Sequence, residues 1–369
     1  MLLRVFQYFC ALIFILTITS RAAEIEAEKI QVWPEHTNFY GSPYNFYYIA
    51  SVNSLNGYSQ SALPVLSRKL RGSTKIFSSP QGNYWAVGKF EDKMTVDFKM
   101  TSVDVHTPSG TILYSVKNPK ALKFVFNDKN PAMVGIDGIQ GMPHANMIFY
   151  NENGQETGTY SMTEFSGGAY CTSAEYFLAH SALSGLYVFT VKGELLYNFL
   201  ISPYYGVSED GLSVLSIDGG RMNFHTRDTR INSINTEIAS PKSIHFAPDN
   251  KSVLILTTSQ IYCFSLPDLT QLWEYTCGSK NESLSSLAVS PDSRYVAVGI
   301  TIDSGPGYSV YDRYNTGRVE ILDSFGSKLY EGNLEYTSWS AGYPKVEFSS
   351  DSRKVWVLAH YELFQLILN

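Results

Sequence analysis

The chain has 369 residues, of which 44% are apolar, so it could bury the core of two average domains or of one large repeat domain. Its formal net charge of -6 at pH 7 argues against nucleic acid or an anionic membrane as a partner, because phosphate binding requires clustered lysine and arginine. The 26 tyrosines and 21 phenylalanines favour β-strands, where aromatic side chains pack well.

The N-terminal segment has the pattern of a signal peptide. Arg4 supplies a positive start, residues 5–18 form an apolar stretch, and Ser20 and Ala22 are the small residues of a cleavage site. We therefore expect cleavage after Ala22, which separates a signal peptide, 1–22, from a mature domain, 23–369. The apolar stretch is short for a membrane span, so we expect a secreted or periplasmic protein without stable membrane insertion; an uncleaved anchor is the alternative.

A four-strand unit recurs along the mature chain. In its clearest copy a polar turn beginning at Ser290 leads into an apolar strand at 295–298, followed by a loop, a strand, a turn and a strand. The corresponding turns begin at Ser79, Asn127, Thr172, Ser208, Ala247, Ser290 and Ser349. A period of about 40–50 residues with four short strands is typical of a β-propeller blade.

A weaker copy precedes the others. The turn at 42–45 leads into an aromatic strand at 46–50, and residues 62–67 are similar to residues 265–270 of a later copy. The sequence therefore predicts an all-β fold, a single β-propeller of four-stranded blades, with eight blades favoured and seven as the alternative.

The repeats resemble those of the YVTN-like, quinoprotein-like and WD-repeat β-propeller superfamily. Residues 268–273 look like one quinoprotein-type repeat, although Gln271 stands where that repeat usually has glycine, and no tryptophan is followed by aspartate. The resemblance implies the architecture and no specific family. Propellers host unrelated functions, so it supplies no activity, and we expect no cofactor.

The last repeat lacks its fourth strand. It offers strands at 345–348, 354–359 and 363–368, after which an outer sheet edge would remain unpaired. We expect the N-terminal strand at 28–33 to complete this C-terminal blade and close the ring. In the seven-blade alternative the donor is residues 65–70.

Three cysteines remain after signal cleavage, too few for a disulfide scaffold: Cys171, Cys263 and Cys277. Cys263 and Cys277 flank a predicted turn on strands that should pair, so they are a possible disulfide. Two packed free thiols are the alternative.

No motif for catalysis or metal binding is present. The sequence has no G-x-S-x-G nucleophile elbow, no phosphate-binding loop and no metal-ligand spacing among its histidines and cysteines. We therefore assign no catalytic residue and no metal site, and favour a non-catalytic protein. His144, in a predicted loop, is a candidate ligand or base, with an ordinary surface role as the alternative.

The long connections should lie on one face of the propeller. Turns between first and second and between third and fourth strands share one face, whereas the long segments 89–100, 137–145, 302–317 and 335–343 belong to the other. These segments carry residue types that are common binding anchors, which we assign with His144 to a binding surface: Tyr308, Tyr311, Arg313, Tyr314, Trp339 and Tyr343. The alternative is that these aromatic residues only cover the rim.

These features predict a monomeric, non-catalytic binding module that recognises a protein or carbohydrate partner through one face. The alternative is a propeller enzyme, a hydrolase, lactonase or lyase, with its site at the central axis.

Overall fold

The structure is a computed structural model, and the predicted signal peptide, 1–22, lies outside the residues that it describes. The described residues are 26–32, 38–41, 46–51, 54–59, 64–69, 74–79, 82–90, 100–137, 144–163, 165–171, 176–181, 185–199, 204–227, 229–238, 240–303, 315–334, 343–359 and 362–368. Over these ranges no helix has the length and apolar character of a membrane span.

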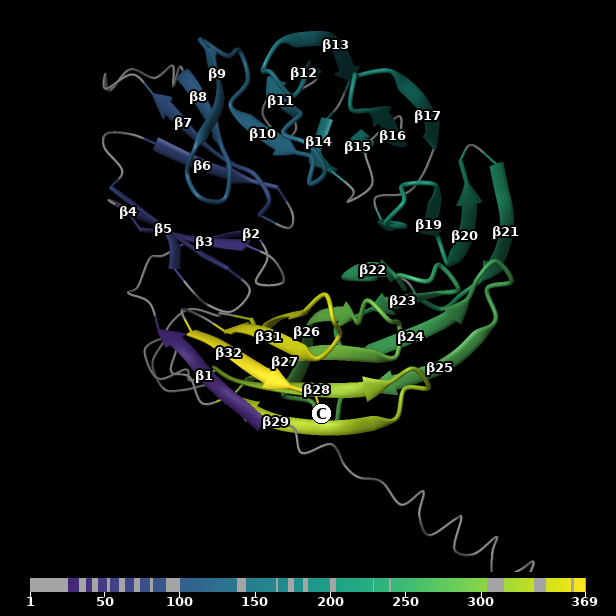
Figure 1. Cartoon of the computed structure of the whole chain (residues 1–369). Coiled ribbons are helices and arrows are strands. Elements are labelled where there is room, and N and C mark those ends of the chain that lie inside the picture. The colour runs from purple at the N-terminus through teal and green to yellow at the C-terminus, as the bar shows by residue number, and fades with distance from the viewer. Residues whose placement is uncertain are drawn as a thin grey trace, which may run out of the picture.

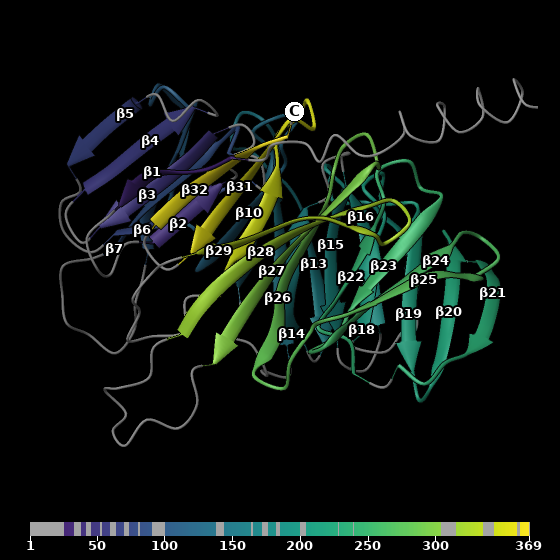
Figure 2. The same ribbon diagram turned by 90° about the horizontal axis from the view of Figure 1, so that it is seen from below.

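Every regular element in the described ranges is a β-strand, and the strands form eight four-stranded antiparallel sheets. Figure 1 shows the sheets following one another around a ring in chain order, and Figure 2 shows the strands crossing the thickness of this ring. The predicted all-β architecture of four-stranded units is confirmed.

The first four sheets each contain four consecutive strands. Sheet 1 consists of β2 (Asn38–Gly41), β3 (Phe46–Ser51), β4 (Ser54–Ser59) and β5 (Pro64–Lys69). Sheet 2 consists of β6 (Thr74–Ser78), β7 (Trp85–Phe90), β8 (Met100–His106) and β9 (Ile112–Lys117). Sheet 3 consists of β10 (Lys123–Phe126), β11 (Met133–Asp137), β12 (His144–Tyr150) and β13 (Glu156–Thr163). Sheet 4 consists of β14 (Phe165–Cys171), β15 (Tyr176–Ser181), β16 (Gly185–Thr190) and β17 (Leu195–Phe199).

The next three sheets continue this pattern, whereas the last takes a strand from the start of the chain. Sheet 5 consists of β18 (Tyr204–Val207), β19 (Ser213–Asp218), β20 (Arg221–Thr226) and β21 (Thr229–Asn235). Sheet 6 consists of β22 (Ser243–Phe246), β23 (Ser252–Leu256), β24 (Gln260–Ser265) and β25 (Gln271–Thr276). Sheet 7 consists of β26 (Glu282–Val289), β27 (Tyr295–Asp303), β28 (Asn315–Asp323) and β29 (Lys328–Leu334). Sheet 8 consists of β30 (Lys345–Phe348), β31 (Lys354–Ala359), β32 (Glu362–Ile367) and β1 (Glu26–Val32).

The strand β1 lies antiparallel to β32, with Glu26 opposite Ile367 and Val32 opposite Glu362. The register shifts once, between Lys29 and Gln31. The other N-terminal candidate, residues 65–70, instead falls largely in β5, which pairs with β4 inside sheet 1. The two ends of the described chain therefore meet in one sheet.

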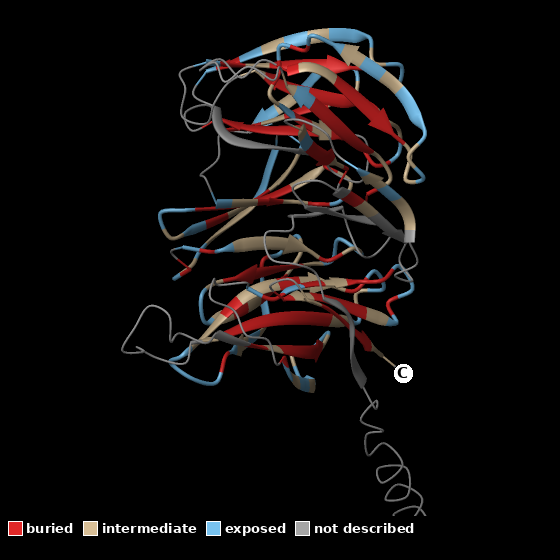
Figure 3. Cartoon of the chain, turned by 90° about the vertical axis from the view of Figure 1, so that its left-hand side faces the viewer, coloured by how far each residue is buried: buried red, intermediate tan, exposed pale blue. Residues whose placement is uncertain are grey.

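Burial follows the position of a strand within its sheet. Where the structure describes their side chains, the second strands are mostly buried on both faces, as in β23, where Val253 to Leu256 are all buried. The outer strands β25 and β29 instead alternate between exposed and half-buried residues. Figure 3 shows buried residues concentrated in the inner strands and exposed residues along the outer ones. The inner strands of neighbouring sheets also contact one another, as β22 contacts β26 and β26 contacts β30.

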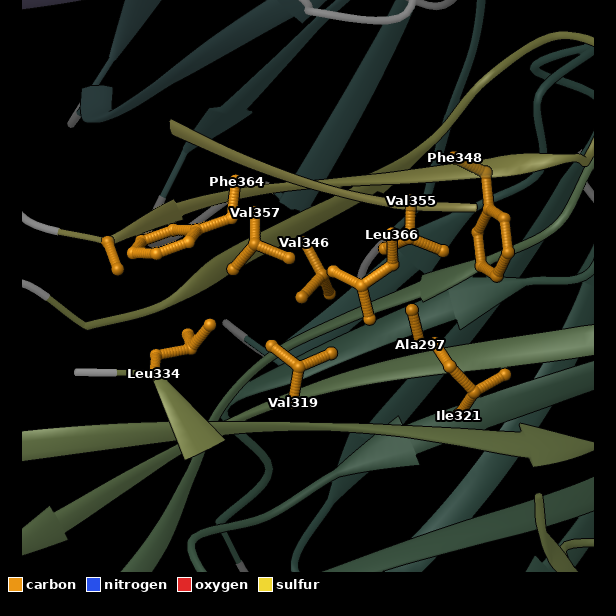
Figure 4. Close-up of a cluster of buried hydrophobic side chains, with 11 residues drawn as sticks. Ala297, Val319, Ile321, Leu334, Val346, Phe348, Val355, Val357, Phe364 and Leu366 are labelled. Atoms are coloured by element: carbon orange, nitrogen blue, oxygen red, sulfur yellow. The ribbon is translucent and has the colours of Figure 1, made fainter. Parts of the chain in front are cut away.

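The hydrophobic core is divided among the interfaces between neighbouring sheets. Between sheets 7 and 8, Val319 and Ile321 of β28 pack in one cluster with Val355 and Val357 of β31 and Phe364 of β32 (Figure 4). Similar clusters join sheets 2 and 3, 3 and 4, 5 and 6, and 6 and 7. These sheets thus bury their faces against neighbouring sheets, as blades of a propeller do.

The recurring polar turn has a defined geometry. In the copies that begin at Ser290 and Ser349, the serine hydroxyl donates to the aspartate two positions later, at 2.7 Å in Ser290–Asp292 and 2.6 Å in Ser349–Asp351. The fourth residue of the turn has a positive φ, 59° at Ser293 and 58° at Ser352. Glycine or asparagine takes this position in three other copies because both accept the left-handed conformation: Gly82, Gly211 and Asn250.

Hydrogen bonds also join the turns of neighbouring sheets. The backbone N–H of Asp292 donates to Ser352 Oγ at 3.2 Å, and that of Asp249 donates to Ser293 Oγ at 3.3 Å. In both cases the acceptor is the fourth residue of the next turn along the chain. The face that carries the short turns is therefore linked from sheet to sheet.

The predicted disulfide is wrong, since Cys263 and Cys277 are both free, buried thiols. Cys263 lies opposite Trp273, whereas the N–H of Cys277 donates to the carbonyl of Ser259, which directly precedes β24 and is four positions before Cys263 in the chain. Four strand residues span roughly 13 Å, beyond the ~7 Å that a disulfide allows between Cα atoms. Burial raises the pKa of the Cys263 thiol to about 11, so this thiol stays protonated at neutral pH.

Candidate functional site

A cavity of about 420 Å³ lies in the inner wall of the ring, where sheets 6, 7 and 8 adjoin. We call it the inner-wall pocket. The strands β22, β26, β30 and β31 contribute its lining: Ser243, His245, Ser285, Ser286, Leu287, Lys345, Val346, Glu347, Trp356 and Leu358. The size is within the usual range of sites for small ligands and peptide segments.

The pocket lies nearer to one face of the ring. Ser243 and Lys345 are the first residues of β22 and β30, and Leu358 is the second-last residue of β31. In each of these sheets the first strand begins, and the antiparallel second strand ends, at the same face of the ring. The links between sheets and the connections from second to third strands therefore lie on that face. The pocket is therefore near the face that carries the long connections, opposite the face of the short turns.

An irregularity in β26 shapes one wall. The register with β27 shifts between Leu284 and Ser286, so Ser285 is an additional residue, a β-bulge. As a result the hydroxyls of both Ser285 and Ser286 donate to the carbonyl of Pro344, at 3.0 and 2.7 Å. Gly299 permits this approach, because a Cβ there would lie 2.5 Å from the Pro344 oxygen. The bulge thus fixes the end of the 335–344 link beside the pocket.

A serine and a histidine meet on another wall. Ser243 Oγ and His245 Nε2 are 2.7 Å apart, since residues i and i+2 of a strand lie on one face. Burial lowers the pKa of His245 to about 4, so the imidazole is neutral at physiological pH and a weak base. A general base works best when its pKa lies near the operating pH. The pair is therefore better suited to hydrogen bonding with a ligand than to activating the serine as a nucleophile.

Lys345, Glu347 and Trp356 share the remaining wall. Glu347 lies opposite Trp356 across β30 and β31, so their side chains lie on the same face of sheet 8, while Val346 and Phe348 pack on sheet 7. Lys345 is exposed and Glu347 half-buried, but Trp356 is only 1% exposed. The indole Nε1 of Trp356 is buried without a hydrogen-bond partner.

Most of the predicted binding surface cannot be located. Five of its residues lie outside the described ranges: Tyr308, Tyr311, Arg313, Tyr314 and Trp339. Tyr343 is 56% exposed and directly precedes Pro344, whose carbonyl accepts hydrogen bonds from two pocket serines. The exposed His144 instead begins β12 in sheet 3, opposite Thr163. His144 and Tyr343 are thus on separate parts of the ring. In the described part of the chain, no three residues of the metal-ligating types gather to hold an ion.

The sequence analysis missed the residues of the inner-wall pocket. Ser243, His245 and Glu347 appeared only as polar positions in short strands. One signal was available, since half-buried polar residues on the first strand of successive repeats indicate a hydrated inner wall. The sequence alone did not show that three such strands meet at one pocket.

Several solved structures are similar to this chain in fold. The C-terminal WD40 domain of Sif2 is 12% identical, with 93% of this chain and 98% of that domain covered and a TM-score of 0.61. The Dos1 propeller is 11% identical, with 93% and 96% covered and a TM-score of 0.57. A eukaryotic initiation factor is 12% identical, with 90% and 83% covered and a TM-score of 0.55.

No protein-family model and no curated protein matches the sequence. The structural similarity establishes a WD-repeat-like β-propeller architecture without a specific family, as the sequence predicted. At these identities the similarity concerns the fold alone.

Proposed function

We propose that the chain is a non-catalytic, extracytoplasmic binding module for a protein partner. In this proposal the signal peptide, 1–22, is removed, the mature domain is an eight-bladed propeller closed by β1, and the monomer binds through the face of the long connections. One observation carries the proposal: three connections on one face, 91–99, 304–314 and 335–344, are much longer than any connection on the other face.

The connections on one face are short. The segments between first and second strands, such as 290–294 and 349–353, contain about five residues and are held by the Ser–Asp turn. On the other face the connections 91–99, 304–314 and 335–344 are much longer. Long connections in a compact domain are usually functional, and these carry the Tyr, Trp and Arg residues that commonly anchor interfaces.

Two further observations support the same face. The inner-wall pocket lies near it, and the bulge at Ser285 holds the end of the 335–344 link beside that pocket. Tyr343, in this link, is 56% exposed. The neutral His245 and the lack of a motif for nucleophilic catalysis favour binding over a hydrolase at the central axis.

The test is a triple variant, Tyr311→Ala, Arg313→Ala and Trp339→Ala. Proteins that co-purify with the wild-type chain from the extracytoplasmic fraction are quantified by mass spectrometry for wild type and variant. We expect at least a tenfold loss of the partner with a nearly unchanged melting temperature, because the proposal makes these three side chains binding anchors and not part of the core.

A matched triple variant on the short-turn side is the control: Arg294→Ala, Phe325→Ala and Leu329→Ala. These side chains are exposed, Phe325 at 79% and Leu329 at 46%. The control should retain the partner. Equal binding by wild type and the first variant, or equal loss in both variants, would contradict the proposal.

A further inference from the structure

The unpartnered indole N–H of Trp356 is the unusual feature of the inner-wall pocket. Buried donors are nearly always hydrogen-bonded, because a donor removed from water without an acceptor costs free energy. Trp356 is 1% exposed, lines the pocket and has no acceptor for Nε1. A pocket occupant with an oxygen acceptor would satisfy this donor.

We propose that the inner-wall pocket binds an uncharged peptide segment of the partner, with an amide oxygen accepting a hydrogen bond from Trp356 Nε1. This inference rests on the proposed binding function and specifies the chemistry of its deepest contact. It makes Trp356 a binding residue that no linear motif indicates.

The charges of the pocket favour an uncharged occupant. Lys345 contributes one positive charge and Glu347 one negative charge, and they are two residues apart on β30. The desolvated imidazole of His245 adds no charge at neutral pH, since burial lowers its pKa. A carboxylate near Lys345 would meet Glu347, and an ammonium near Glu347 would meet Lys345, so either charge gains little.

The mixture of polar and apolar groups suits a peptide. Lys345 and the Trp356 indole can donate, Glu347 and the Ser243–His245 pair can accept, and Leu287, Val346 and Leu358 offer apolar contact. An amide presents both a donor and an acceptor on a partly apolar chain. A sugar ring would need an exposed aromatic face for stacking, and the face of Trp356 is covered. The same burial means that the wall must yield slightly for an oxygen to reach Nε1.

The test is an NMR titration of the full mature chain carrying ¹⁵N-labelled tryptophan. The chain has five tryptophans. The indole N–H signal of Trp356 is assigned by its loss in Trp356→Phe or by its nuclear Overhauser contacts to Leu358. The probe is N-acetyl-asparagine N′-methylamide, with glucose and sodium acetate in parallel. We expect the diamide alone to shift the Trp356 indole signal saturably. Trp85 is the internal control, because its Nε1 already donates to the Thr107 carbonyl at 2.7 Å.

The methyl signals of Leu287 and Leu358 give the dissociation constant of the diamide for the wild-type chain and for Trp356→Phe. Trp356→Phe should raise this constant by about fivefold or more, since one hydrogen bond to a buried donor is lost. An unmoved Trp356 signal, or one that responds to acetate or glucose instead, overturns the inference. This outcome is independent of the triple-variant test. If the triple variant loses the partner but the diamide shifts no signal, the pocket inference is wrong and the binding face stands. If the diamide binds but the triple variant keeps the partner, the pocket inference stands and the proposed binding face is wrong.

Discussion

Arg318 of β28 lies among carboxylates between sheets 6 and 7. Its guanidinium forms two hydrogen bonds of 2.8 Å with Glu282 and lies 2.9 Å from Glu320, whose side chain is fully buried. Tyr275 of sheet 6 donates a hydrogen bond to the same Glu320. One arginine therefore neutralises acidic side chains from two strands of sheet 7.

Replacing Arg318 should destabilise the protein strongly. Arg318→Leu leaves Glu282 buried without its counter-charge and leaves Glu320 with only the more distant Lys328, at 3.7 Å. Breaking a buried ion pair in this way typically costs about 3–5 kcal/mol. Unfolding in urea measures the loss. Arg294→Leu is the control, because Arg294 is exposed and its ion pair with Asp292 contributes little. Similar unfolding curves for wild type and Arg318→Leu would show that the cluster is not structurally important.

His245 should make stability depend on pH. Its pKa is lowered by burial to about 4, whereas the unfolded chain titrates near the ordinary value of about 6.5. The unfolded state then binds more protons as the pH falls through this window, so stability is complete above about pH 6.5 and is lost toward pH 4. Burial also lowers the pKa of His106, His180 and His225, which adds to the loss with the same sign.

The variant His245→Asn should reduce this dependence by about 1–3 kcal/mol between pH 7 and 4.5, because a neutral amide replaces the titrating ring. Urea unfolding at the two pH values measures the difference. His144→Asn, at an exposed position, is the control. If His245→Asn loses as much stability on acidification as the wild type, another group causes the loss.

At the residue scale, the sequence predicts which side chains share a strand face but not which strand lies opposite. Ser243 and His245 alternate with Ile244 and Phe246 in the expected way. The pocket exists because β22 lies near β26 and β30, and this depends on the placement of three repeats around the ring. For the same reason, Trp356 was not predicted as a binding residue.

At the element scale, the polar turns were the most predictable feature. The chemistry of a turn is local: a serine, an aspartate two residues later and a residue that accepts positive φ specify it without help from the rest of the chain. Such a turn also allows the ends of the adjoining strands to be predicted accurately. The strands β30 and β31 begin and end where the sequence predicted. The Cys263–Cys277 prediction failed because pairing register depends on the other strand.

Deleting residues 24–33 should lower the melting temperature markedly. The deletion removes β1, and β32 loses the backbone hydrogen bonds along a register that runs from Glu26–Ile367 to Val32–Glu362. An unpaired strand edge also promotes aggregation. Differential scanning calorimetry measures the change, and a deletion of residues 23–25, just before the strand, is the control. An unchanged transition after the longer deletion would contradict the proposed ring closure.

At the scale of the whole molecule, the repeat predicted the architecture, and the similarity to the WD40 domain of Sif2 and the Dos1 propeller confirms it. The first repeat was the weakest in the sequence because its turn at 42–45 lacks the serine–aspartate spacing that marks the copies at Ser208, Ser290 and Ser349. The number of repeats therefore stayed open. Neither a partner nor a ligand follows from architecture, because function depends on side chains that the fold only positions.

The pairing of β1 with β32 has a consequence for the order in which the molecule can assemble. The other sheets are each made of consecutive strands and can form as the chain is synthesised, whereas β1 emerges first and its partner last. Contacts between such distant segments form slowly, because the entropy of closing a long loop is lost before the contacts contribute favourable free energy. Until then both strands keep an open edge, and a neighbouring copy of the chain can supply the missing strand. Crowded synthesis should therefore favour exchanged dimers, in which β1 of one copy completes sheet 8 of another.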